Sequence, residues 1–69
     1  MLNRNDFVNL IAIFENAIKL NVSAEESSLL LGFPSTYYVN IISKVEASHL
    51  KGTLSHDDWS IYSDYVSKL

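Results

Sequence analysis

Residues 22–42 read VSAEESSLLLGFPSTYYVNII, and this stretch decides the fold. Ser23 is a favourable helix N-cap, and Glu26 follows three residues later, as in a capping box. Gly32 comes after three leucines and supplies the left-handed backbone that commonly ends a helix. Pro34 suits the first turn of a following helix, because its missing N–H costs nothing there. The stretch therefore predicts a short helix, a glycine turn and a second helix.

A first helix is predicted upstream of this hairpin. Asn3 or Asn5 can cap it, and it runs to about Leu20. Its apolar stripe recurs at helical spacing and consists of Phe7, Leu10, Ile11, Phe14, Ala17 and Ile18. Three further residues widen the stripe: Val8, Ala12 and Ile13. Two explanations stay open, namely a helix central to the core and a helix that also meets a partner chain.

The third and fourth helices are also defined by apolar spacing. The third helix has an inward stripe of Tyr38, Ile41, Ile42 and Val45. Gly52 marks a break after it, and Ser55 then begins a fourth helix with Asp58 at the capping-box position. Leu54 precedes this N-cap and is expected to pack on Trp59. The inward face of the fourth helix is predicted to hold Trp59, Tyr62, Val66 and Leu69.

Size and composition limit the fold further. The 69 residues predict one domain spanning 1–69, near the lower limit for a self-sufficient core. Cysteine is absent, so no disulfide stabilises the chain, and two glycines and one proline favour a compact helical protein. We therefore expect an all-α, small four-helix domain with a helix-turn-helix at 23–45. No signal peptide or membrane span is recognisable, so a cytoplasmic location is expected.

The segment 14–38 resembles a known family. Its residues 22–38, VSAEESSLLLGFPSTYY, are similar to the N-terminal helix-turn-helix of Xre/ParS-type antitoxins, a branch of the lambda-repressor-like domains. The family usually places a basic or aromatic residue after the tyrosine pair, where this chain has Val39 and Asn40. The chain also ends before the region that binds a toxin in that family. The resemblance implies the fold and regulatory binding to DNA, and it does not imply antitoxin activity.

The third helix is the predicted DNA-reading element. Its predicted outward face consists of Ser35, Thr36, Tyr37, Val39, Asn40, Ser43 and Lys44. Asn40 can pair with an adenine edge, and Thr36 or Val39 can contact a thymine methyl group. Lys44 is the only cation on this helix, and the net charge of the chain is −3. Because one chain neutralises few phosphates, we expect a homodimer that engages two half-sites of double-stranded DNA.

The alternative is an acidic protein-binding module that does not bind DNA, such as an inhibitor or adaptor of a nucleic-acid enzyme. Its candidate partner-binding residues are Asp57, Asp58 and Tyr65, because acidic side chains match a basic groove and tyrosine is favoured at interfaces. An enzyme is the weakest interpretation, since no catalytic motif is present. The segment His56–Asp57–Asp58 matches no common metal-site spacing. No catalytic residue, metal or cofactor is expected.

Overall fold

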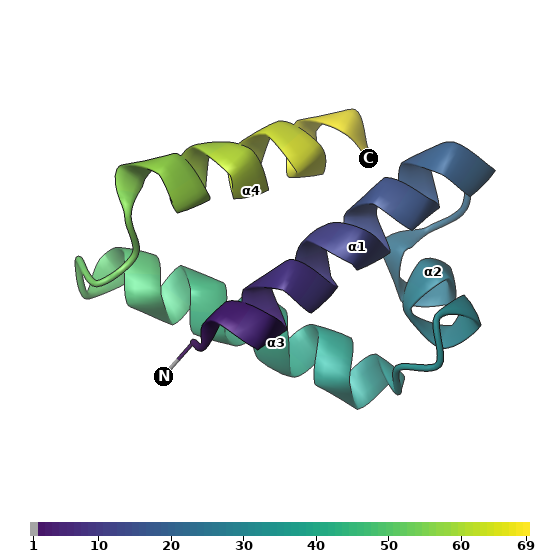
Figure 1. Cartoon of the computed structure of the whole chain (residues 1–69), viewed down its shortest axis with the longest axis horizontal. Helices are drawn as coiled ribbons and strands as arrows, with labels where there is room; N and C mark the ends of the chain where they lie inside the picture. The colour runs from purple at the N-terminus through teal and green to yellow at the C-terminus, as the bar shows by residue number, and fades with distance from the viewer. Residues whose placement is uncertain (1) are drawn as a thin grey trace.

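The helix α1 (Arg4–Leu20) lies at the centre of the fold in the computed structural model, which describes residues 2–69. The other three helices, α2 (Ala24–Leu30), α3 (Ser35–Leu50) and α4 (His56–Lys68), all pack against it. In Figure 1, α1 crosses in front of α3, with α2 beside its C-terminal half and α4 on its other side. All elements of residues 2–69 are helices, which confirms the predicted all-α, four-helix fold.

Side-chain caps begin three of the helices. Asn3 caps α1, since its Oδ1 accepts a hydrogen bond from the backbone N–H of the residue three positions on, at 2.8 Å. Ser23 and Ser55 cap α2 and α4 in the same way, each at 3.1 Å. Such a cap contributes about 1 kcal/mol to helix stability. The capping predictions for Ser23 and Ser55 are confirmed, and Asn3 rather than Asn5 caps the first helix.

The turn between α2 and α3 spans Leu31 to Pro34. Gly32 has a φ of 87°, in the left-handed region that residues with a side chain rarely adopt, so its predicted role is confirmed. The prediction that Pro34 lies in the first turn of α3 is wrong by one residue. Pro34 is the N-cap, with an extended backbone at φ −61° and ψ 150°, and the helix begins at Ser35.

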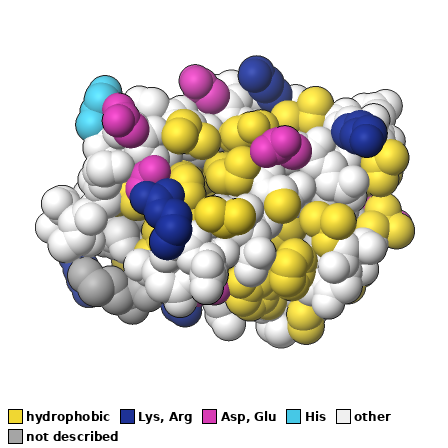
Figure 2. Space-filling model, viewed as in Figure 1, with side chains coloured by type: hydrophobic (Ala, Val, Ile, Leu, Met, Phe, Trp, Pro, Cys, Tyr) yellow, Lys and Arg dark blue, Asp and Glu magenta, His cyan; other side chains and the backbone are white. Residues whose placement is uncertain are grey.

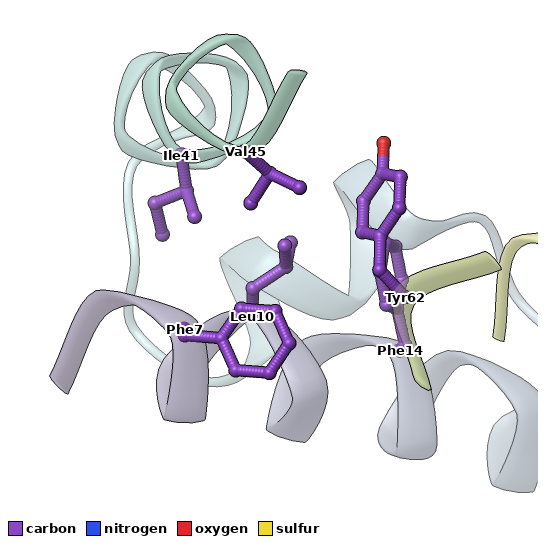
Figure 3. Close-up of a cluster of buried hydrophobic side chains, with 6 residues drawn as sticks. All are labelled: Phe7, Leu10, Phe14, Ile41, Val45 and Tyr62. Atoms are coloured by element: carbon purple, nitrogen blue, oxygen red, sulfur yellow. The ribbon is translucent and has the colours of Figure 1, made fainter. Parts of the chain in front are cut away.

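The hydrophobic core forms where α1, α3 and α4 meet. Figure 3 shows its six buried side chains pointing toward one another: Phe7, Leu10 and Phe14 of α1, Ile41 and Val45 of α3, and Tyr62 of α4. The rings of Phe14 and Tyr62 lie 5.9 Å apart, centroid to centroid. Each such fully buried side chain contributes about 1.5–3 kcal/mol relative to exposure. This one cluster joins the first and last helices of the chain.

The inward faces of α1 and α4 differ from the sequence prediction. Ile13 is fully buried, whereas Ile18 remains 39% exposed. The cause is α2, which packs against the Ile13 side of α1. On α4, Val66 and Leu69 are exposed rather than inward, and Tyr65 instead stacks on Phe14 with 6.2 Å between ring centroids. The residues of α4 that contact α1 are thus those at positions 58, 62 and 65.

Small polar residues, and not leucines, attach α2 to the rest of the fold. Ser27 and Ser28 are fully buried, while Leu29, Leu30 and Leu31 are exposed by 57%, 58% and 41%. The Ser27 hydroxyl donates to the Ile13 carbonyl oxygen at 2.7 Å. Because serine is small, α2 can approach α1 closely, and the hydrogen bonds satisfy the hydroxyl groups. The leucines are left on the outer surface.

Candidate nucleic-acid interface

The candidate reading surface is the exposed face of α3 between Ser35 and Lys44. Six of the seven predicted DNA-contacting residues are exposed there: Ser35, Thr36, Val39, Asn40, Ser43 and Lys44. Consecutive helix residues are rotated by about 100°, so these six fall within roughly one half of the helix circumference. The buried residues of α3, which include Ile41 and Val45, occupy the other half. The sequence therefore assigned the two faces of this helix correctly.

The N-terminus of α3 differs from those of the other helices. Pro34 makes no side-chain capping hydrogen bond, and the first turn of α3 contains no acidic residue. By contrast, α1, α2 and α4 each have a side-chain cap and at least one acid in the first turn. Free backbone N–H groups and the positive end of the helix dipole favour a phosphate at such a terminus.

Tyr37, the seventh predicted residue, is held by α1. Its hydroxyl donates to Asp6 Oδ1 at 2.8 Å and accepts from Asn9 Nδ2 at 2.8 Å. The Asn9 bond lowers the pKa of Tyr37, but burial and the Asp6 carboxylate together outweigh it, so the pKa is raised. The ring also stacks on Phe33, with 5.1 Å between centroids. Tyr37 therefore links α1 to α3 through hydrogen bonds. The prediction that its side chain belongs to the exposed face of α3 is wrong.

Asp6 also contacts the only cation of α3. The Lys44 ammonium lies 3.6 Å from Asp6 Oδ2, and the side chains are 45% and 14% exposed, respectively. Asp6 thus joins Tyr37 and Lys44 through its two oxygens. An ion pair of this kind, partly open to water, contributes about 1 kcal/mol or less. A phosphate oxygen near Lys44 therefore competes with Asp6 for the ammonium.

The acidic residues are unevenly distributed around this surface. None of the eight acids lies between Ser35 and Lys44, and the only acid of α3, Glu46, is in its C-terminal half. Glu25 and Glu26 lie in the first turn of α2, on the other side of the turn. The segment Ser35–Lys44 therefore contains no acid, although the Asp6 carboxylate contacts Lys44 and Glu46 lies two residues beyond it. This distribution could not be read from the total charge.

The alternative partner-binding residues lie at another place in the fold. Asp58 pairs with Arg4 at 2.9 Å, and both line a groove between α1 and α4 that Tyr65 also lines. Tyr65 is partly covered by Phe14, and burial together with nearby Glu15 raises its pKa. Asp57 is exposed and is not among the residues that line this groove. Thus Asp58 and Tyr65 share one surface, which is separate from the exposed face of α3.

Sequence reasoning missed Asp6 and Asn9 as residues of the site. The signal was present, since these two polar residues are three positions apart among the apolar residues of the first half of α1. Their spacing places them on one face of α1, where α3 packs. Two polar residues that interrupt a buried stripe at helical spacing indicate partners on the neighbouring element. Which residue of α3 they meet depended on the packing of the two helices.

The remaining polar candidates do not gather into a metal site. Within residues 2–69, no group of three or more His, Cys, Asp or Glu side chains is close enough to hold a metal ion. His49 instead stacks on Trp59, with 3.6 Å between ring centroids and an interplanar angle of 5°. In the same range, no single helix is long and apolar enough to cross a membrane; α1 and α2 pass that test only as a pair, bent by 106°.

No protein-family model, curated protein or solved structure matches the chain.

Proposed function

We propose that the chain binds double-stranded DNA in the cytoplasm as a small transcriptional regulator, with α3 in the major groove. The proposal depends on one observation above all: from Ser35 to Lys44, α3 presents an exposed and largely polar face without acidic residues, and the helix begins without a side-chain cap. A short helix and a four-residue turn precede α3, and this order of elements supports a helix-turn-helix. The similarity of residues 22–38 to Xre/ParS-type antitoxins agrees with this proposal.

The residues of α3 have distinct roles in the proposed complex. Asn40 is exposed at the middle of the face, where its amide can donate to N7 and accept from N6 of an adenine. Val39, which is 54% exposed, offers a methyl surface to thymine. Ser35 and Thr36 lie in the first turn, so their hydroxyl and backbone groups are placed to contact phosphate.

The experiment is selection from duplexes that carry a randomised central region, followed by binding measurements on the enriched sequence. We expect the wild-type chain to enrich one sequence. Asn40→Ala should bind that sequence with about 1–3 kcal/mol less free energy and lose selectivity at one base pair. Asn5→Ala is the matched control, because Asn5 is an exposed asparagine on α1 outside the face. Equal binding by both variants contradicts the role of α3.

A second candidate function is a protein-binding module without DNA binding. It is favoured by the three consecutive exposed leucines of residues 29–31, because contiguous exposed apolar surface marks interaction sites. This candidate predicts that Leu29→Ser and Leu30→Ser abolish capture of a partner while leaving the fold unchanged. It also predicts that no duplex is enriched in the selection described above. The two functions are therefore separated by the same DNA experiment.

A further inference from the structure

The chain leaves more large hydrophobic side chains exposed than it buries. Among residues 2–69, eight hydrophobic residues form the buried core, whereas eleven large ones are substantially exposed. Figure 2 shows hydrophobic side chains extending over α1 and its junction with α4, with charged side chains of both signs among them. Apolar surface of this extent on a small domain marks an interaction surface.

The hollow part of this surface is a groove between α1 and α4. Its volume is about 820 Å³, and its apolar walls are Val8, Ile11 and Ile18 on α1 and Ile61 and Tyr65 on α4. Val8 is 55% exposed and Ile61 is 41% exposed. The two helices run in the same direction, because Arg4 meets Asp58 near their N-termini and Phe14 meets Tyr65 farther along. A groove between two neighbouring helices is a surface on which the side-chain ridges of a third helix can pack.

The α1 wall of the groove has a self-complementary charge pattern. Arg4, Val8, Ile11 and Glu15 all line it at spacings of four, three and four residues, which is the spacing of a coiled-coil seam. This row reads basic, apolar, apolar, acidic. In an antiparallel pairing about a point between residues 9 and 10, Val8 opposes Ile11. Arg4, which also pairs with Asp58 of its own chain at 2.9 Å, opposes Glu15. A two-fold axis repeats both contacts, as an isologous interface requires.

From this pattern we infer that a second copy of the chain occupies the groove, with its α1 antiparallel to the first. The C-terminal end of the second α1 then carries Lys19 toward Asp57 and Asp58 at the start of α4, where the charges are opposite. A stable interface covers about 800 Å² of each partner, roughly a fifth of the 4442 Å² surface of this chain. The inference does not depend on DNA binding by α3.

The first test compares two matched substitutions by light scattering and sedimentation. The wild-type chain should have twice its monomer mass of 7.8 kDa at about 100 µM. Val8→Asp places a charge against Ile11 of the second copy, so we expect the dimer to weaken about a hundredfold or more. Val39→Asp is the control, since Val39 is equally exposed but lies on α3. Circular dichroism checks that both variants keep their helices.

The second test examines the antiparallel register. Glu15→Arg opposes Arg4 of the second copy at both ends of the interface, and the dimer should weaken about tenfold. Adding Arg4→Glu restores opposite charges between the copies, but it also removes the Arg4–Asp58 pair within each chain. The double variant should therefore dimerise more tightly than either single variant, Glu15→Arg or Arg4→Glu. The inference would be overturned by a monomeric wild type or by a Val8→Asp variant that still dimerises as tightly as the wild type. Failure of the double variant to recover dimerisation would overturn the antiparallel register.

Discussion

At the scale of single residues, Asp6 is expected to limit how strongly the candidate reading face attracts DNA. Its carboxylate holds the Lys44 ammonium at 3.6 Å and accepts the Tyr37 hydroxyl bond at 2.8 Å. Asp6→Asn removes the charge but keeps an oxygen that can accept from Tyr37. Because Lys44 is then free to contact phosphate, we expect tighter DNA binding and a salt slope steeper by about one. Asp64→Asn, an equal change of charge on α4, should leave the slope nearly unchanged.

The buried Tyr62 is expected to make the folded state less stable at alkaline pH. Burial raises its pKa, and nearby Glu46 and Tyr38 raise it further. The neutral phenol is thus favoured in the folded state, so stability is complete below the unfolded pKa of about 10 and falls as the pH rises through the folded value. Tyr62→Phe should lose less of its melting temperature between pH 9 and pH 11 than the wild type. An identical loss in both proteins would contradict this role.

At the scale of elements, Ser27 attaches α2 to α1. Its hydroxyl donates to the Ile13 carbonyl oxygen and accepts from Asn16 Nδ2 at 3.1 Å, in a fully buried place. Ser27→Ala leaves both partners without this contact, so we expect a loss of about 1–3 kcal/mol in the free energy of unfolding. Ser43→Ala, on the exposed face of α3, should change it by less than about 0.5 kcal/mol. Urea unfolding measures both.

The helix ends were predicted well because they depend on residues that are close together in the sequence. Ser23, Gly32 and Ser55 mark helix ends through short-range hydrogen bonds and backbone geometry, and each lies where the sequence predicted it. The inward faces were predicted less well. Val66 has helical spacing from Tyr62 yet is exposed, because α4 meets α1 along its other edge, through Tyr65. The angle at which two helices cross is not encoded in the period of either one.

In the candidate site, too, the features set by neighbouring residues were predicted and a contact between distant residues was not. The exposed residues of α3 followed from its period, and six of seven were placed correctly. Tyr37 was misplaced because its partners, Asp6 and Asn9, are about thirty positions away in the chain. Contacts at that separation depend on how α1 lies across α3. A single sequence gives the two polar positions on α1 but not their partner.

For the whole molecule, the two proposed interaction surfaces are the groove between α1 and α4 and the exposed face of α3. The groove of α1 and α4 is proposed to join two copies, and α3 lies on a different side of α1. Each copy therefore keeps its own reading helix free in the proposed dimer. Because each α3 carries one lysine, the affinity for random DNA should be low and should depend only weakly on salt. Selectivity is then expected to come from base contacts.

The most direct measurement of the central claim is fluorescence anisotropy of the wild-type chain with the enriched duplex and with a scrambled duplex, at several salt concentrations. We expect selective binding of the enriched duplex, with a slope of log K against log salt of about −1 to −2 per chain. Absence of binding at about 50 mM salt, or equal affinity for the two duplexes, would contradict DNA reading by α3.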